Sequence, residues 1–371
     1  VDRRITVRAT SAVDGQAPAS VSSQPLFEAL SVPITPAFAH KTPNFVDFKQ
    51  TAALHKMVSR GGMALASGDI IGDGLEDCFI GGTYPGSKAC FLVRTPQGGF
   101  KQVPLSIHGE HDDTAALLFD ADGDKDLDLY VVCGGAQRDA SDKAFYQDQL
   151  YLNDGRGTFS LAAANALPDL SGSGSCITAT DFDQDGDLDL FVGGRLIPGK
   201  YPLPARSYLL RNDTANGVAR FTDVTAQVFP WLQEAGLVCS AIWTDINQDK
   251  CPDLIVAGEW MPIGVAQGSW TTSRGLKTYK LTRLADPFGK DVAAVGWWNS
   301  LAQGDFDNDG DLDYIAGNEG LNTLYRASTQ EPVSLVAKDF NNDGTFDPIM
   351  GYFIKGISYP AIPRDALNQQ I

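Results

Sequence analysis

Aspartates at alternating positions are the residues of this chain best suited to chemistry. In residues 181–189 they occupy positions one, three, five, seven and nine, with glycine at position six. Carboxylates packed this closely repel one another, so a tight turn that holds them together is favourable only around a hard divalent cation. Calcium suits such a turn because it takes about six to eight oxygen ligands in flexible geometry. We therefore expect a calcium site with side-chain ligands at positions one, three, five and nine and a backbone carbonyl ligand at position seven.

The same nine-residue loop recurs along the chain. Its starts are Asp69, Asp120, Asp181, Asp245, Asp305 and Asp339. A short apolar stretch follows each loop and reaches glycine at Gly81, Gly134, Gly193, Gly258, Gly317 and Gly351. The loop resembles the start of an EF-hand loop, but its closing acid is an Asp at position nine and the apolar stretch after it reads as a strand. Such recurrence indicates an array of equivalent units, none of which can bury its apolar face alone.

The pattern predicts the metal ligands of each loop. In order along the chain they are Asp69, Asp73 and Asp77; Asp120, Asp122, Asp124 and Asp128; Asp181, Asp183, Asp185 and Asp189; Asp245, Asn247, Asp249 and Asp253; Asp305, Asp307, Asp309 and Asp313; and Asp339, Asn341, Asp343 and Asp347. We expect about five or six calcium ions (Ca2+) in these loops.

Three loops depart from the full pattern. Lys125 and Lys250 stand where glycine would relieve a positive φ, and Pro252 further alters the fourth turn. Ile71 at position three of the first loop offers no oxygen. The first loop is therefore either a weaker site completed by water or an empty acidic turn.

The acidity of the chain is concentrated in these loops. Of its 46 Asp and Glu residues, 25 lie in the six loops, and the formal net charge is -17. Bound divalent ions would neutralise most of this charge, so it says little about partners, and no basic patch favours a nucleic-acid role. No apolar stretch reaches the roughly 18 residues of a membrane span, so we expect no transmembrane segment.

The first part of the chain lacks the loop motif. Only residues 4–10 alternate like a strand, and residues 12–23 have the Ala, Ser, Gly and Pro content typical of a linker. We expect residues 1–40 to be the tail of a preceding module and a linker. Residues 41–371 should form the repeat domain, with its last unit incomplete.

The cysteines leave two interpretations open. An even number of them would allow disulfides in an exported protein, and Cys78 could face Cys90 across a hairpin. Most lie in apolar, strand-like runs, which favours buried free thiols. The full set is Cys78, Cys90, Cys133, Cys176, Cys239 and Cys251.

Each unit has the same order of elements: a strand of small apolar residues, the acidic loop, an apolar strand, glycine, and one or two further strands. Small residues suit an innermost strand that is crowded around an axis. The expected first strands are residues 63–66, 115–119, 176–180, 239–243 and 300–303. Three or four antiparallel strands in a unit of about 60 residues predict an all-β fold, a calcium-binding β-propeller closed into a ring.

The loop and the strand after it resemble the FG-GAP/VCBS-type repeat of integrin α-subunit propellers and many bacterial surface proteins. The chain is still more similar to long bacterial surface proteins that combine such repeats with a cartilage-acidic-protein-like segment. Residues 45–48, 258–262, 296–299 and 317–322 carry this closer resemblance. It implies a calcium-bearing propeller, usually of seven blades, located outside the cell or at the bacterial outer-membrane surface. The seventh blade would come from a degenerate N-terminal stretch or from chain beyond residue 371.

Other candidates for chemistry are few. His108 and His111 lie near two aspartates, but a solvated loop between blades explains them more simply. Trp260, Trp297 and Trp298 would suit either a platform for a sugar or packing between blades. The sequence holds no nucleophile elbow, P-loop or dinucleotide fingerprint.

Three functional hypotheses follow. The first is a non-enzymatic binding or scaffold propeller at a cell surface, with a protein or glycan ligand. The second, from a different class, is a calcium-dependent lyase or hydrolase that cleaves polysaccharides. The third makes the chain a subunit of an outer-membrane nutrient-uptake complex.

Overall fold

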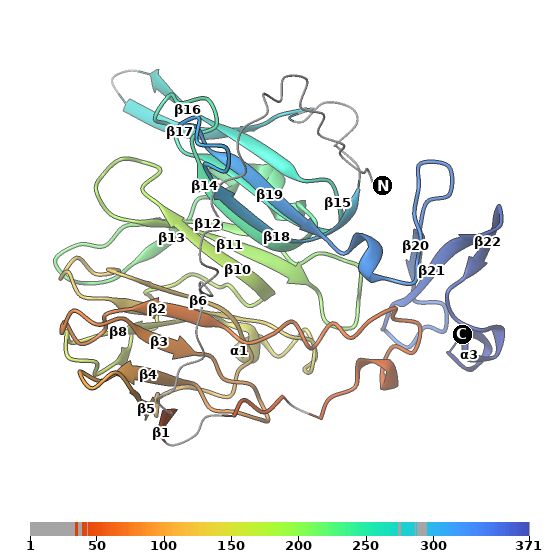
Figure 1. The fold of residues 1–371 in the computed structure, drawn as a ribbon, viewed down its shortest axis with the longest axis horizontal. Helices are drawn as coiled ribbons and strands as arrows, with labels where there is room; N and C mark the ends of the chain where they lie inside the picture. The colour runs from red at the N-terminus through yellow and green to blue at the C-terminus, as the bar shows by residue number, and fades with distance from the viewer. Residues whose placement is uncertain are drawn as a thin grey trace, which may run out of the picture.

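The computed structural model describes residues 34–35, 39–42, 44–273, 276–285, 287 and 295–370. Within these residues the fold is all-β, built from several small antiparallel sheets with a few short helices (Figure 1). The strand expected at residues 4–10 lies outside the described residues. No helix among the described residues is long and apolar enough to cross a membrane.

Four sheets of similar design follow one another along the chain. The first has the order β1-β5-β4-β3-β2, with β1 (Ile34–Thr35), β2 (Leu65–Gly68), β3 (Asp77–Ile80), β4 (Cys90–Arg94) and β5 (Phe100–Pro104). The second contains β6 (Asp113–Phe119), β7 (Asp128–Cys133), β8 (Gln149–Leu152) and β9 (Ser160–Leu161). The third contains β10 (Ser173–Thr180), β11 (Asp189–Leu196), β12 (Tyr208–Asn212) and β13 (Phe221–Asp223). The fourth contains β14 (Leu237–Thr244), β15 (Asp253–Met261), β16 (Gly264–Ser273) and β17 (Leu276–Arg283).

The last two units are shorter. The fifth has β18 (Gly296–Gly304) and β19 (Asp313–Asn318), and β18 also pairs with the end of β15. The sixth has β20 (Ser334–Lys338), β21 (Asp347–Ile354) and β22 (Ile357–Pro360). The helices are α1 (Lys143–Tyr146), α2 (Thr225–Val228) and α3 (Arg364–Gln370), with 3-10 turns η1 (Asp47–Lys49), η2 (Pro230–Glu234) and η3 (Gly320–Asn322).

The first strands of successive sheets are neighbours. β2 contacts β6, β6 contacts β10, β10 contacts β14, and β14 contacts β18. This confirms the expected series of small-residue first strands and gives the molecule a propeller-like arrangement. The core lies between the sheets, because alternate side chains of one strand point to opposite faces. Leu129 packs in a cluster with Phe79 of the first sheet, whereas Tyr130 packs in a cluster with Leu190 of the third.

Two of the glycines that follow the loops, Gly134 and Gly258, lie where the backbones of two segments meet. A Cβ added at Gly134 would lie 2.5 Å from the carbonyl oxygen of Gly174 in the next sheet. One added at Gly258 would lie 2.2 Å from the carbonyl oxygen of Leu237. No side chain fits at either position, which explains why these two residues are glycine.

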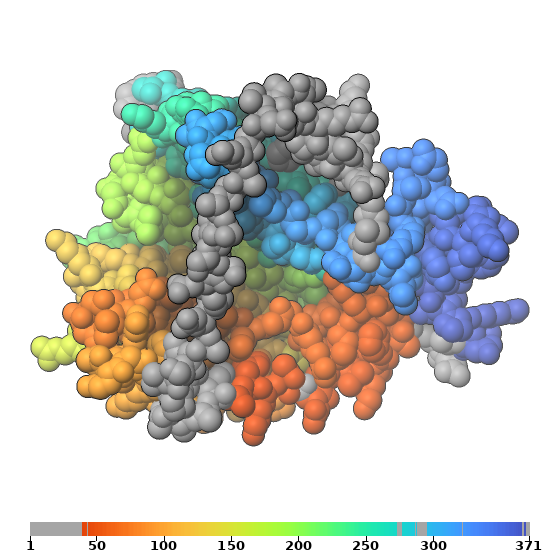
Figure 2. Space-filling model, in the orientation of Figure 1, coloured from red at the N-terminus to blue at the C-terminus, as the bar shows by residue number. Residues whose placement is uncertain are grey.

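The described strands do not close into a ring, contrary to the prediction. The three-stranded sheet of the sixth unit forms a lobe at the right of Figures 1 and 2. Apolar side chains stay exposed on the fifth and sixth sheets, with Ile315 54% exposed and Val336 61% exposed. Closure of a propeller would bury such residues between blades, and the described part of the chain does not do so.

The cysteines are free thiols, as favoured from the sequence. Cys78 is paired with Leu92 in the sheet register and Cys90 with Ile80, so the two cysteines are not opposite each other. Burial raises the pKa of the Cys90 thiol, which makes it a poor nucleophile.

Candidate metal centres

The six acidic loops connect the first two strands of their sheets. The first loop, for example, joins β2 to β3 and the third joins β10 to β11. Each loop turns twice through positive φ, at positions four and six. Position four is Gly72, Gly123, Gln184, Gln248, Asn308 or Asn342, and position six is Gly74, Lys125, Gly186, Lys250, Gly310 or Gly344. Lys125 and Lys250 thus adopt the turn that glycine makes elsewhere, and both side chains are exposed.

The aspartate at position nine is held by the protein backbone. Asp189 is fully buried and accepts the amide of Phe182 at 3.0 Å through Oδ2 and that of Asn212 at 2.8 Å through Oδ1. Asp128 accepts the amides of Ala121 and Asn153 in the same way, at 2.8 and 2.9 Å. These hydrogen bonds hold the position-nine carboxylate of both loops against the sheet, whether or not the loop binds an ion.

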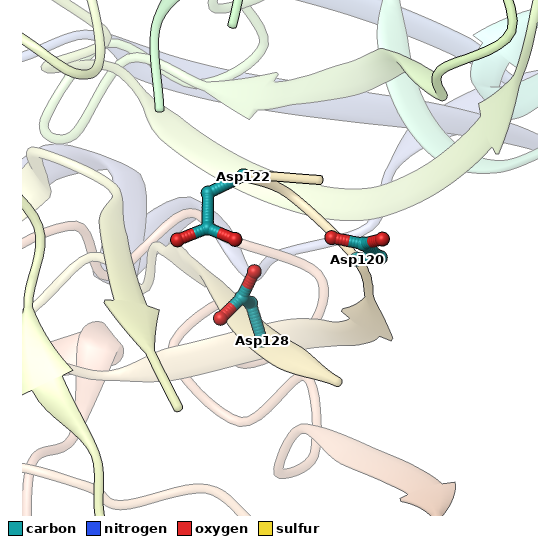
Figure 3. A group of neighbouring side chains, drawn as sticks. All are labelled: Asp120, Asp122 and Asp128. Carbon is teal, nitrogen blue, oxygen red and sulfur yellow. The ribbon is translucent and has the colours of Figure 1, made fainter. Parts of the chain in front are cut away.

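Three loops bring carboxylates together as the sequence predicted. The groups are Asp120, Asp122 and Asp128; Asp181, Asp183 and Asp189; and Asp305, Asp307 and Asp313. In each group one oxygen from every residue lies within 4.8 Å of the others, and Figure 3 shows the first group converging on one point. This spacing suits oxygens that share one cation.

Oxygens without partners also point to a cation. Asp183 Oδ1, Asp187 Oδ1 and Asp126 Oδ1 are buried and have no hydrogen-bond partner. A buried carboxylate oxygen left unpaired is costly, and a divalent ion would satisfy it. The donor set therefore fits calcium.

The pKa values of these acids show the same electrostatic strain. Burial, with the Asp183 carboxylate adding to it, raises the pKa of Asp189 to about 8 against its backbone hydrogen bonds. Burial and then the Asp185 charge raise the pKa of Asp187 to about 7. Burial likewise raises the pKa of Asp128 to about 6. Without a cation, Asp187 and Asp189 of the third loop would not both be fully charged near neutral pH.

Positions five and seven lie outside the three close acid groups, and the ligand role predicted for position five stays a prediction. The position-five carboxylates do not belong to the three close groups of the described residues. Instead they accept the position-seven amide, at 3.1 Å from Asp126 N to Asp124 Oδ1 and at 3.3 Å from Asp187 N to Asp185 Oδ1. The position-seven side chains, assigned only a backbone role from the sequence, supply two of the unpaired oxygens. The sequence could have indicated a side-chain role for position seven, because this position is Asp in all three loops that form a close acid group.

The other three loops share the turn but not the full acid group. In the first, the Asp69 carboxylate accepts the amides of Gly72, Asp73 and Gly74, and Ile71 packs against the apolar cluster around Phe79. In the fourth and sixth, the position-three residue is asparagine. Asn247 Nδ2 donates to Asp249 at 2.8 Å, and Asn341 Nδ2 donates to Asp343 at 3.0 Å.

One stretch of the chain is similar in sequence to a known repeat. Residues 132–192 match the model of the FG-GAP-like repeat. The matched span runs from the end of β7 to the middle of β11 and includes the third loop. No curated protein matches the chain, so the resemblance to bacterial surface proteins with a cartilage-acidic-protein-like segment stays a prediction.

Two solved structures are distantly similar. A thermostable family-43 glycoside hydrolase is 10% identical with a TM-score of 0.34, over 81% of this chain and 93% of the hydrolase. The rhamnogalacturonan lyase PL11 of Bacillus licheniformis is 13% identical with a TM-score of 0.32, over 75% of this chain and 54% of the lyase. Similarity at this level carries no argument about activity.

The acidic loops also join neighbouring sheets. Asn153 Nδ2, in the second sheet, donates to the carbonyl of Ile70 in the first loop at 2.9 Å. Thr214 Oγ1, in the third sheet, donates to the carbonyl of Ala121 in the second loop at 2.9 Å. A loop that loses its shape would therefore loosen the contact between two sheets as well as its own turn.

The histidines are not in a solvated loop, contrary to the prediction. The His108 side chain is only 5% exposed and pairs with Asp113 at 2.8 Å. His111 lies 3.3 Å from the carbonyl of Phe145, and burial lowers its pKa. Both rings have structural partners between the first two sheets.

The tryptophan platform is partly present, because Trp260 and Trp297 are in contact while Trp298 is not among the pocket-lining residues near them.

Proposed function

We propose that this chain is a calcium-stabilised, propeller-like module with a non-enzymatic binding or scaffold role. The observation that carries the proposal is the convergence of three carboxylates in each of three loops, with buried oxygens that lack partners. Calcium bound there would neutralise the acids and stabilise only the folded state.

The residues that would hold the ion differ among the loops. In the second, third and fifth loops they are the aspartates at positions one, three and nine, assisted by position seven. In the fourth and sixth loops an asparagine amide oxygen replaces one carboxylate, which lowers the ligand charge but keeps the oxygen. The first loop has no oxygen at position three, so we propose the weakest binding there.

The location and partners of the module remain part of the proposal. Extracellular calcium modules typically bind at about 0.1–1 mM, which favours a site outside the cell, such as the bacterial outer-membrane surface. The loops lie at one end of the strands, and the close acid groups found among the described residues all belong to these loops. The opposite strand ends therefore suit a protein or glycan ligand. Outer-membrane uptake proteins are one class of partner for such a surface.

Counting the bound ions tests the metal sites directly. Equilibrium dialysis against calcium, followed by elemental analysis, should give about three to six ions per chain. Asp183→Ala should remove one ion, because it deletes a member of a close carboxylate group. Asp73→Ala is the matched control and should change the count little, since its loop carries Ile71 at position three. A chain that binds no calcium, or an Asp183→Ala variant with an unchanged count, contradicts the proposal.

We expect no polysaccharide cleavage by this chain. The 25 loop acids would be ion ligands, and a cation lowers the basicity of a carboxylate. His108 Nε2 is occupied by its contact with the Asp113 carboxylate at 2.8 Å. The measurement is the appearance of new reducing ends or unsaturated products when calcium-loaded protein is incubated with plant and bacterial polysaccharides. Products that form after repurification and disappear in His108→Ala would establish the enzyme hypothesis instead.

A further inference from the structure

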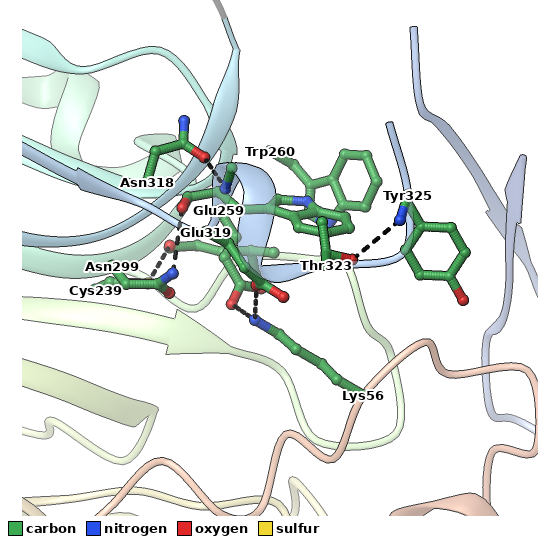
Figure 4. Close-up of polar contacts among 12 residues, drawn as sticks. Lys56, Cys239, Glu259, Trp260, Asn299, Asn318, Glu319, Thr323 and Tyr325 are labelled. Atoms are coloured by element: carbon green, nitrogen blue, oxygen red, sulfur yellow. Dashed lines mark hydrogen bonds and ion pairs between the residues drawn. The ribbon is translucent and has the colours of Figure 1, made fainter. Parts of the chain in front are cut away.

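A pocket of about 270 Å³ lies at the strand ends opposite the acidic loops. It is formed where β15 ends, where β18 begins and where β19 leads into η3 and the segment up to residue 333. Its aromatic lining is Trp260, Trp297 and Tyr325. Its polar lining includes Asn318, Thr323 and Arg326. Figure 4 shows several of these side chains together with the charged residues next to them.

Trp260 is held in an unusual backbone conformation at this pocket. Its φ is +58°, a value that bulky residues rarely adopt and that costs roughly 1–3 kcal/mol. The cause is a bulge in β15, where Glu259 pairs with Trp297 and Met261 pairs with Gly296. The bulge turns Trp260 away from the alternation of the strand and toward the pocket.

A hydrogen-bonded chain holds the ring in this position. Trp260 Nε1 donates to Tyr201 Oη at 2.7 Å, and Tyr201 Oη donates to Glu259 Oε2 at 3.3 Å. The one polar atom of the indole is therefore used inside the protein. What the ring offers to the pocket is apolar surface.

The second tryptophan is supported in a similar way. His55 stacks on Trp297 with ring centroids 5.1 Å apart and an interplanar angle of 18°. Burial, with Lys56 adding to it, lowers the pKa of His55 to about 4, so this ring is neutral near neutral pH. Trp260 and Tyr325 stand nearly perpendicular to Trp297, at 5.2 and 6.5 Å. The three rings form a rigid aromatic corner.

The polar lining decides which ligand suits this corner. No carboxylate occurs among the described residues that line the pocket, so it lacks the negative charge that would favour a cationic ligand. The rest of the lining is largely apolar, and its amide and hydroxyl groups come from Asn318, Thr323, Ser328 and Thr329. Asn318 is oriented by accepting the amide of Gly320 at 3.0 Å. A sugar ring has matching chemistry, because its C–H face packs on an aromatic ring while its hydroxyls bond to amides and hydroxyls at the edge.

We propose that this pocket is a saccharide-binding site, in which a pyranose ring packs on Trp260 and its hydroxyls reach Asn318 and Thr323. The inference rests on the proposed binding role and names the class of ligand. Arg326 also lines the pocket. Its guanidinium suits a hydroxyl of a neutral sugar or the carboxylate of an acidic sugar.

The test is affinity electrophoresis of the calcium-loaded protein in gels that contain glucan, mannan, xylan or polygalacturonate. We expect at least one polysaccharide to retard migration, with the neutral and acidic gels distinguishing the two kinds of sugar. Trp260→Ala and Tyr325→Ala should each weaken retardation about tenfold, because each removes an aromatic contact at the centre of the site. Tyr325→Ala leaves the strained bulge intact, so its effect reports on the pocket and not on folding.

Trp270→Ala is the matched control, since Trp270 lies in β16 and outside the pocket. The Trp270→Ala variant should be retarded in the gel as strongly as the unaltered protein. If no gel retards a folded protein, or if Trp260→Ala and Tyr325→Ala migrate as the control does, the saccharide assignment is wrong. Bound calcium, measured on the same samples, separates this outcome from a failure of the metal sites.

Discussion

Removal of calcium should lower the thermal midpoint of this protein by about 10 °C or more. Each occupied loop stabilises the folded state by roughly 1–3 kcal/mol when free calcium exceeds the dissociation constant by one or two orders of magnitude. Several loops contribute, and two of them also bond to the neighbouring sheet through Asn153 and Thr214. Loss of the ions would therefore act on the turns and on the contacts between sheets.

Differential scanning calorimetry with excess chelator, followed by millimolar calcium, measures this effect. The midpoint should recover on adding calcium, and magnesium should restore less because it prefers fewer, more rigid ligands. A melting curve that does not change in chelator contradicts the metal proposal.

The second large effect on stability is expected when Glu259 is replaced. Glu259 is a buried acid on the face opposite the loops. Its carboxylate is ion-paired with Lys56 and Arg195 and accepts the Tyr201 hydroxyl at 3.3 Å. These partners come from the segment before β2, from β11 and from the turn after β11. Burial opposes its ionisation, but Arg195 and then Lys56 outweigh burial and lower its pKa.

Glu259→Ala should reduce the free energy of unfolding by about 3–5 kcal/mol, because it leaves the Arg195 charge buried without its partner. Glu234→Ala, at an exposed position in η2, should change it by less than about 0.5 kcal/mol. Urea unfolding of both variants in saturating calcium measures the difference. Equal stability of the two variants would show that the ion pairs contribute nothing.

The contribution of Glu259 to the free energy of unfolding should decrease as the pH falls. A lowered carboxylate pKa stabilises the folded state above the ordinary Glu value of 4.5, and the contribution is lost as pH falls below it. Unaltered protein and Glu259→Ala should therefore differ in stability at neutral pH and converge in acid.

The sequence was sufficient for the acidic loops and for the strands on either side of them. The nine-residue spacing predicted loops between strands, and the observed loops join the first two strands of each unit. Small residues predicted the neighbouring first strands, for example at β6, β10 and β14. The physical reason is that a turn and a strand are specified largely by the conformational preferences and side-chain alternation of their own residues.

Features that depend on contacts between distant segments were decided only by the tertiary structure. Ile71 packs in an apolar cluster with Tyr151 of the second sheet, and the His111 ring lies 3.3 Å from the carbonyl of Phe145, 34 residues further along the chain. The spacing of Trp260 and Trp297 gave no sign that a bulge would bring their rings together. Glu259 and Lys56 are 203 residues apart, so no local pattern indicates that they form an ion pair. Burial and partner identity arise when sheets pack on one another, and that packing is a property of the whole array.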